Sequence, residues 1–149
     1  MCDKAVLNNN LEMLKYAHEN GCKLHKLLTS SAAARNNLKI LKYLHENGCP
    51  WHDWTCIYAV GNNNIEMMEY AHKNGCPWSK EVCSHAAYYN NYKILNYARE
   101  RGCPWDKYAC EATVSKNNMK MLKHLRGNGC PWDGAILAII AKENNMEML

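Results

Sequence analysis

The stretch from Glu66 to Trp78 reads EMMEYAHKNGCPW, and variants of it recur along the chain. The glycine of its Gly-Cys pair falls at residues 21, 48, 75, 102 and 129. An Asn-Asn pair precedes each Gly-Cys pair at the same distance, so the sequence has a constant period of 27 residues. A fixed period between about 20 and 50 residues predicts a stack of small repeated units in place of one globular core.

The frames of this repeat cover 1–27, 28–54, 55–81, 82–108 and 109–135, and a partial sixth frame covers 136–149. We therefore expect residues 1–149 to form a single repeat array of about five and a half repeats. The last frame stops at Leu149, which corresponds to Leu122 in the middle of a predicted helix. Neither end carries the polar capping repeat that a solenoid needs, which indicates a fragment of a longer chain.

The first half of each frame predicts a short helix, from about Asp53 to Asn62 in the third frame. Cys56, Ala59 and Val60 recur there at spacings of three and four, which places them on one buried face. Side chains that accept a hydrogen bond are preferred at the N-terminal capping position of a helix. That position is expected at His52, Ser79, Asp106 and Asp133 in successive frames.

The second half predicts another helix, from about Asn64 to Asn74. Its buried residues are expected to be Ile65, Met67, Met68 and Ala71, with Tyr70 at the edge of this stripe. Opposite charges four residues apart on the other side predict three exposed ion pairs, namely Lys15–Glu19, Lys42–Glu46 and Glu69–Lys73. Gly75 fits the left-handed position that ends a helix, and Pro77 prevents its continuation.

Two helices of about ten residues cannot bury enough apolar surface alone, so each unit must stack on its neighbours. One tryptophan per frame is expected to cover the loop side of each junction, at positions 51, 78, 105 and 132. Lys23 and Leu24 replace Pro and Trp in the first frame, which predicts a looser junction there.

Several segments resemble the ankyrin repeat. Asn-Asn-Leu-Glu-Met-Leu-Lys-Tyr at 9–16 is similar to the family's Gly-His-Leu-Glu-Val-Val-Lys-Leu, and HENGC at 18–22 resembles its helix end and Gly-Ala turn. Ala59 and Val60 stand where the family has paired alanines. The resemblance covers the whole chain and implies an all-α helix-turn-helix solenoid.

The repeat also departs from that family, whose unit is about 33 residues long and opens on Thr-Pro-Leu-His. Here the tetrapeptide is absent and GCPW is too short for a projecting β-hairpin, so we expect shortened loops in its place. Short, divergent arrays of this kind resemble those of large DNA viruses of amoebae and of some protists, which implies a viral protein that interacts with its host.

The nine cysteines form two series. One follows the glycines, at 22, 49, 76, 103 and 130, and the other lies in the first helices, at 2, 56, 83 and 110. Zinc needs four ligands around one ion, whereas equivalent residues on stacked helices lie about 8 to 10 Å apart. We interpret the cysteines as buried structural thiols, with a thiol or zinc-binding array as the alternative. A bridge between Cys49 and Cys56 is not excluded by spacing, although Thr29 and Leu137 occupy the Cys56 phase elsewhere.

Other chemistry has little support. His18, His45, His72, Arg99 and Arg126 share one phase, which we interpret as a surface position that accepts any basic residue, although an HxxxC ligand pair is conceivable. No catalytic triad, phosphate-binding loop or carboxylate pair stands out, so we expect no enzyme activity and no cofactor or metal.

Partner classes and location follow from charge and composition. The net charge of +4 is spread over repeating surface phases, which does not indicate nucleic-acid binding. No apolar run approaches the length of about 20 residues that spans a bilayer. No signal-peptide pattern opens the chain, so the cysteines are expected in a reducing compartment, the cytoplasm, or the host cytoplasm for a viral protein.

Variation among the repeats indicates a binding surface. Framework positions scarcely change, whereas four phases of the first helix change freely. In ankyrin repeats the first helices line a concave groove that binds proteins, and the resemblance implies the same here. Exposed aromatic residues are enriched in binding hot spots. We therefore predict a non-catalytic protein-binding scaffold that contacts its partner through Ile57, Tyr58, Asn62, Ser84, His85, Tyr88, Tyr89, Glu111, Ser115 and Lys116.

Two alternatives remain open at this point. Surface residues also drift when nothing constrains them, which would make the variable positions ordinary surface. The array would serve as the substrate-recruiting arm of a ubiquitin ligase if an F-box-like segment lay outside these residues.

Overall fold

The computed structural model describes residues 1–142, and every regular element in that range is an α-helix. The chain divides into two compact units, Met1–Trp78 and Ser79–Leu149. The first unit holds α1 (Cys2–Leu7), α2 (Leu11–Glu19), α3 (Leu27–Ala34), α4 (Leu38–Glu46), α5 (Thr55–Gly61) and α6 (Ile65–Lys73). The second holds α7 (Lys80–Tyr88), α8 (Tyr92–Glu100), α9 (Lys107–Ser115), α10 (Met119–Gly127) and α11 (Gly134–Lys142).

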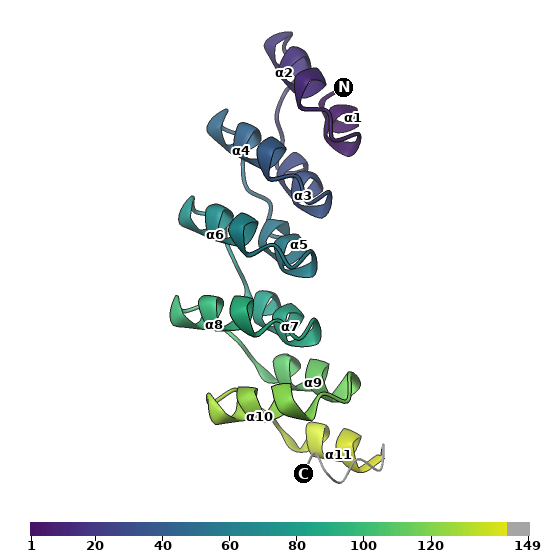
Figure 1. The fold of residues 1–149 in the computed structure, drawn as a ribbon, viewed down its shortest axis with the longest axis vertical. Coiled ribbons are helices and arrows are strands. Elements are labelled where there is room, and N and C mark those ends of the chain that lie inside the picture. The colour runs from purple at the N-terminus through teal and green to yellow at the C-terminus, as the bar shows by residue number, and fades with distance from the viewer. Residues whose placement is uncertain (143–149) are drawn as a thin grey trace. The chain divides into compact units, whose positions relative to one another are not determined.

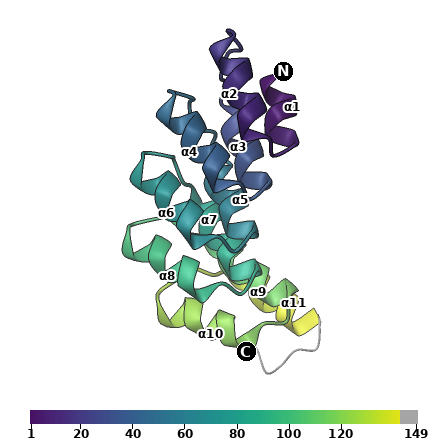
Figure 2. The ribbon, with the colours of Figure 1, turned by 45° about the horizontal axis from the view of Figure 1, so that its top comes forward.

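Within each unit the helices form antiparallel pairs that repeat in a regular order (Figures 1 and 2). In the first unit α1 packs on α2, α3 on α4 and α5 on α6, while α3 lies between α1 and α5. In the second unit α7 packs on α8 and α9 on α10, while α9 lies between α7 and α11. This arrangement confirms the predicted all-α class of paired, repeating helices without strands in the described residues.

The Asn-Asn pair performs two distinct tasks in the turn between paired helices. Its first member has a positive φ, between 52° and 56° in the five repeats, a region that asparagine tolerates better than most residues. Its second member caps the next helix, as Asn64 Oδ1 accepts the Met67 N–H at 2.9 Å.

The same asparagines also connect neighbouring repeats through their side chains. Asn64 Nδ2 donates to Asn36 Oδ1 at 2.7 Å in the first unit, and Asn118 Nδ2 donates to Asn90 Oδ1 at 3.0 Å in the second. A longer contact of 3.4 Å joins Asn37 to Asn9. We call these side-chain contacts between successive turns the asparagine ladder.

The end of the second helix confirms its prediction. Gly75 has φ +84°, and its N–H donates to the His72 carbonyl at 3.1 Å. The Cys76 N–H donates to the Ala71 carbonyl at 2.9 Å, which closes the last turn. Only glycine adopts this backbone conformation without steric strain, so the Gly-Cys pair fixes where the helix stops.

The buried stripe of the second helix is as predicted except at its start. Met67, Met68 and Ala71 are fully buried. Tyr70 lies at the edge of the stripe, as expected, while Ile65 is only partly buried. Ile65 is the first residue of α6, so it lies at the rim of the packed face.

The exposed ion pairs follow the prediction at one of three places. Lys73 pairs with Glu69 at 3.8 Å. Lys15 pairs instead with Glu12 at 3.5 Å. Lys42 reaches Glu66 of the next helix pair at 3.9 Å. The spacing rule considers only residues of one helix, so it cannot predict a pair such as Lys42–Glu66, whose members lie on different helices.

The predicted first-helix caps hold in part. Asp106 Oδ1 accepts the Tyr108 N–H and Asp133 Oδ1 the Ala135 N–H, both at 3.0 Å. His52 Nδ1 accepts the Trp54 N–H at 3.1 Å, although α5 begins only at Thr55. Ser79 occupies the cap position without a cap hydrogen bond from its side chain. Its hydroxyl instead bonds the Glu81 carboxylate, which lowers the pKa of Glu81.

Candidate functional site

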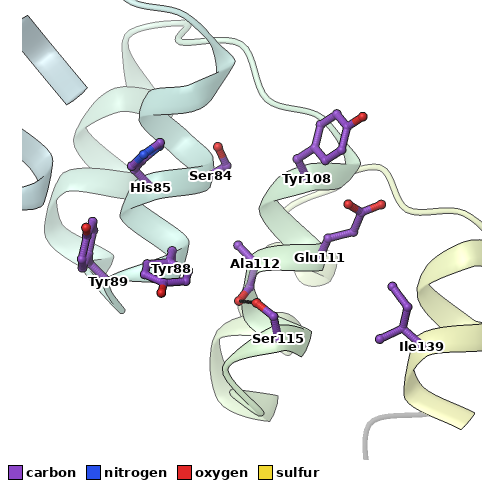
Figure 3. A pocket seen from close by; sticks show the side chains of 9 residues that line it. All are labelled: Ser84, His85, Tyr88, Tyr89, Tyr108, Glu111, Ala112, Ser115 and Ile139. Carbon is purple, nitrogen blue, oxygen red and sulfur yellow. Dashed lines mark hydrogen bonds between the residues drawn. The ribbon is translucent and has the colours of Figure 1, made fainter. Parts of the chain in front are cut away.

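An open groove of about 550 Å³ lies on the first helices of the second unit. Figure 3 shows its lining side chains on three successive first helices, α7, α9 and α11. The lining residues are Ser84, His85, Tyr88, Tyr89, Tyr108, Glu111, Ala112, Ser115 and Ile139. We call this feature the aromatic groove.

Helix α7 supplies one wall because its two sides differ. Val82, Cys83, Ala86 and Ala87 are buried, whereas the polar and aromatic residues Ser84, His85 and Tyr88 line the groove. His85 Nδ1 lies 2.8 Å from the Glu81 carbonyl oxygen, so the ring is held against its own helix. At the helix end, the Tyr88 and Tyr89 rings meet edge to face, with their centroids 5.1 Å apart.

Helix α9 supplies the floor and the opposite wall. Ala112 is small, and Ser115 Oγ donates to its carbonyl at 2.9 Å, so both leave open space. The Glu111 carboxylate lies 3.9 Å from Lys107 Nζ. Ile139 of α11 adds a partly exposed apolar side chain at the far end. The groove thus combines apolar surface with a few fixed polar groups, as binding pockets do.

Lysines surround the aromatic rings of the groove. Lys80 Nζ and Lys107 Nζ lie 5.4 and 5.7 Å from the Tyr108 ring centroid. Lys116 Nζ lies closer, 4.1 Å from the Tyr88 ring centroid. These distances are those of cation–π interactions, so the lysines hold the rings in place.

Two of these lysines form ion pairs with aspartates, and the third does not. Lys80 bonds Asp106 at 2.7 Å and Lys107 bonds Asp133 at 2.8 Å. These hydrogen bonds raise the pKa of each lysine and lower the pKa of Asp133. Among the described residues, Lys116 has no acidic partner within ion-pair distance. It is therefore the cation at the groove that is available to an external anion.

The groove gathers six of the ten predicted binding residues: Ser84, His85, Tyr88, Tyr89, Glu111 and Ser115. Lys116 lies beside them on the Tyr88 ring. Three lining residues were not in the predicted set. Ala112 follows His85 by one period and lies in one of the four variable phases, although it was left out of the predicted binding residues. Ile139 follows His85 by two periods, so extending the same phase to the sixth frame would have found it. Tyr108 precedes the variable phases at the helix start, and no pattern marked it.

The three predicted residues of the first unit differ from one another. Tyr58 is exposed, with its ring centroid 6.0 Å from that of Trp54. Asn62 is exposed too, but its amide donates to the Ala33 carbonyl at 2.9 Å and so supports the turn. Ile57 was expected at the surface and is in fact buried, with 5% of its surface exposed. It belongs to the core of the first unit, where its helix α5 contacts both α3 and α6.

The basic phase of the second helix has a definite structural role, which corrects its interpretation as tolerant surface. In four repeats the basic side chain stacks on the tryptophan of the following loop. The ring centroids lie 4.7 Å apart for His45–Trp51 and 3.5 Å for His72–Trp78. The guanidinium carbon lies 3.9 Å from the ring centroid for Arg99–Trp105 and 4.2 Å for Arg126–Trp132. The tryptophans are only partly buried, so this stacking completes their environment.

The cysteines are buried, except for a partly exposed Cys22, but they are not all separate thiols. Cys2 and Cys22 form a disulfide, which the interpretation as structural thiols did not include. The Cys49 thiol donates to the His25 carbonyl at 3.3 Å and makes no bridge to Cys56. Within residues 1–142, no group of three or more His, Cys, Asp or Glu side chains is arranged to hold a metal ion.

Comparison with known proteins finds a similarity for part of the chain. Residues 30–72 match the family model described as ankyrin repeats (many copies). The match confirms the resemblance for this segment, which runs from α3 to α6. It gives no support to the expected viral or protist source. No curated protein matches the chain at a significant level. In the part of the chain that the structure describes, no helix is long and apolar enough to cross a membrane.

Proposed function

From the assignment of residues 30–72 to the ankyrin repeat family, we propose that this chain is a non-catalytic scaffold that binds a partner protein. Ankyrin repeats generally mediate protein–protein interactions and are usually non-catalytic. The partner is proposed to bind the first-helix face, at the aromatic groove. The single observation that carries this placement is the groove of about 550 Å³ lined by exposed tyrosines.

The tyrosines suit protein recognition in both chemistry and rigidity. Tyr88, Tyr89 and Tyr108 are 41%, 52% and 52% exposed, although each carries a large apolar ring. Tyrosine is enriched among residues that dominate binding energy. Their rings are already positioned by each other and by lysines. A preorganised surface loses less conformational entropy on binding, which increases affinity.

The positive charge at the groove favours a partner segment that carries a carboxylate. The chain carries a net charge of +4, and Lys116 projects its ammonium over Tyr88 without an acidic partner in the described residues. Glu111 is already paired with Lys107. The partner segment therefore presents an apolar or aromatic side chain to the groove and a carboxylate to Lys116. Tyr58 and Asn62 of the first unit stay predicted contact residues and do not line the aromatic groove.

Two of the alternatives predicted from the sequence, a zinc-binding array and an arm of a ubiquitin ligase, rest on no specific observation. The described residues contain no group of three or more His, Cys, Asp or Glu side chains arranged to bind a metal. No observation on them supports a role in a ubiquitin ligase. A cytoplasmic location and a host partner likewise stay predictions. The experiment below therefore targets the residues of the aromatic groove.

The test compares two variants with equal numbers of substitutions. In the groove variant, Tyr88→Ala and Tyr89→Ala remove two lining rings, whereas in the control variant Tyr16→Ala and Met13→Ala remove two exposed side chains of α2. Proteins captured from a cell lysate by the unaltered chain are identified by mass spectrometry, and binding of the purified partner is titrated. Circular dichroism verifies equal helicity.

The expected result is a loss of binding in the groove variant alone. Removal of one hot-spot tyrosine costs about 2 kcal/mol, which corresponds to about 30-fold in Kd. Lys116→Glu should also weaken binding, because it places a carboxylate opposite the proposed carboxylate of the partner. Equal affinity of the unaltered chain, the groove variant and the control would show that the aromatic groove is not the binding site.

A further inference from the structure

Four cysteine pairs share one spacing in the sequence, and the proposed function gives them no role. They are Cys2 and Cys22, Cys56 and Cys76, Cys83 and Cys103, and Cys110 and Cys130, each separated by 20 residues. One member lies on a first helix and the other in the Gly-Cys turn that ends the repeat. The second repeat is the exception, because Thr29 takes the helix position opposite Cys49.

The backbone brings the two members of the first pair within bridging distance. Cys2 and Cys22, which form a disulfide, have their Cα atoms 6.3 Å apart, within the range of about 4.4 to 6.8 Å that disulfides require. The turn is the same in the second unit. The amides of Cys22, Cys103 and Cys130 each bond the carbonyl five residues earlier, at 3.0, 2.9 and 3.0 Å. The first helices that carry the partners also repeat with the same period.

In the second unit the paired thiols contact each other directly. Cys83 and Cys103 are joined by a side-chain hydrogen bond, as are Cys110 and Cys130. The sulfur atoms of Cys103 and Cys130 also lie 3.4 Å from backbone carbonyl oxygens, those of Ser79 and Asp106 respectively. All four cysteines are completely buried.

The surroundings make one thiol of each pair more acidic. A hydrogen bond from the second thiol lowers the pKa of Cys103 and of Cys110 below the usual thiol value. Arg99 and Arg126 act in the same direction and are held at the turn by hydrogen bonds to the Cys103 and Cys130 carbonyls. The lone thiol of Cys49 differs, because burial raises its pKa to about 11.

We propose that Cys83–Cys103 and Cys110–Cys130 are reversible oxidation sites, at which a small disulfide of the glutathione class converts each thiol pair into a disulfide within one repeat. The new bond links the first helix of a repeat to the turn after its second helix. Cys83 and Cys110 are the sequence neighbours of Ser84 and Glu111 in the aromatic groove. Oxidation therefore stiffens the two helices that carry most of the groove.

The exchange proceeds in two balanced steps. The thiolate of the more acidic cysteine attacks one sulfur of oxidised glutathione, forms a mixed disulfide and releases a glutathione thiolate. The second cysteine gives its proton to this thiolate, attacks the mixed disulfide and releases the second glutathione, which takes the proton that the first cysteine lost to solvent. Two protein thiols are oxidised by two electrons, and oxidised glutathione is reduced to two thiols.

The test measures disulfide formation at equilibrium in buffers of reduced and oxidised glutathione. Folded chain and chain refolding from urea are equilibrated separately, so that burial of the thiols does not limit the result. Remaining thiols are blocked with N-ethylmaleimide, and the linked peptides are identified by mass spectrometry. We expect bridges Cys83–Cys103 and Cys110–Cys130 from both directions, while Cys49 is recovered blocked. Thiols that stay reduced in excess oxidised glutathione, or single glutathione adducts and mixed pairings, would overturn the proposal.

A matched variant provides the control. Cys83→Thr reproduces the natural state of the second repeat, in which Thr29 is fully buried and its hydroxyl donates to the Lys26 carbonyl at 2.7 Å, so the variant should fold. It should lose the Cys83–Cys103 bridge and keep Cys110–Cys130. In the unaltered chain each bridge should raise the Tm of the oxidised form by about 6 °C or more, and the rise should be smaller in Cys83→Thr. An equal rise in both proteins would contradict the proposed bridge.

Discussion

The turn after α2 and the turn after α8 occupy the same place in their repeats and are held by different means. After α2 the sequence is Cys22-Lys23-Leu24, and Cys22 is bonded to Cys2. After α8 the sequence is Cys103-Pro104-Trp105. There the Trp105 ring stacks under the Arg99 guanidinium at 3.9 Å, and Arg99 also donates to the Cys103 carbonyl.

The difference shows that the loop decides what the basic residue of the second helix does. Arg99 stacks on a tryptophan. His18 has the same phase but no tryptophan to stack on, and its Nδ1 lies 2.9 Å from the Tyr43 hydroxyl of the next repeat. One position of the repeat thus supports its own loop in one place and a neighbouring helix in another.

The largest expected effect comes from removing the aromatic ring of the later turn. Trp105→Ala should lower the free energy of unfolding by about 2 to 4 kcal/mol, somewhat less than for a fully buried tryptophan. Leu24→Ala is the matched change in the first turn and should cost about 1 kcal/mol, because Leu24 is a smaller side chain that is only partly buried. Urea denaturation followed by circular dichroism measures both values. Equal losses at the two positions would show that the turns are held alike.

A smaller effect is expected from the stacked cation. Arg99→Ala should cost about 1 to 2 kcal/mol, because it removes the cation–π contact and the hydrogen bond to the Cys103 carbonyl. Arg99→His should retain most of the stability, since histidine stacks on tryptophan at His45 and His72. Thermal unfolding of the two variants measures the contrast. If Arg99→His lowers the Tm as much as Arg99→Ala does, stacking on Trp105 is not the stabilising contribution of this position.

The smallest effect is a gain of stability. Lys23→Pro combined with Leu24→Trp gives the first turn the Cys-Pro-Trp sequence of the later ones. We expect an increase of about 0.5 to 1 kcal/mol from the fixed proline and the new stack on His18. Urea denaturation measures the gain, and the His18 ring signals in NMR should shift as the ring leaves Tyr43. Unchanged signals would mean that the tryptophan has not been accommodated.

The repeating part of the fold could be predicted from the sequence because its signals are local. Gly75 must adopt a positive φ, and Met67, Met68 and Ala71 must share a face of one helix. The contacts that were missed are formed between segments 6 to 28 residues apart. Arg99 with Trp105, Cys2 with Cys22 and Asn36 with Asn64 become neighbours only when helices pack.

The candidate site could be predicted in outline for a different reason. The groove residues of α7 and α9 vary while the framework repeats, and the period carries this contrast from frame to frame. Periodicity says which positions face the same side, but it does not say how close a neighbouring helix lies. Ile57 was therefore expected at the surface although it is covered, and Tyr108 was overlooked although it is exposed.

The asparagine ladder also bears on how the array comes apart. Asn64 caps α6 through Oδ1 and bonds Asn36 of the previous repeat through Nδ2, so one side chain serves two repeats at once. Opening one repeat removes a partner from the next and lowers the energy needed to open it. In repeat proteins such nearest-neighbour coupling determines how far unfolding spreads. Within each unit, amides should therefore exchange with solvent in blocks of whole repeats.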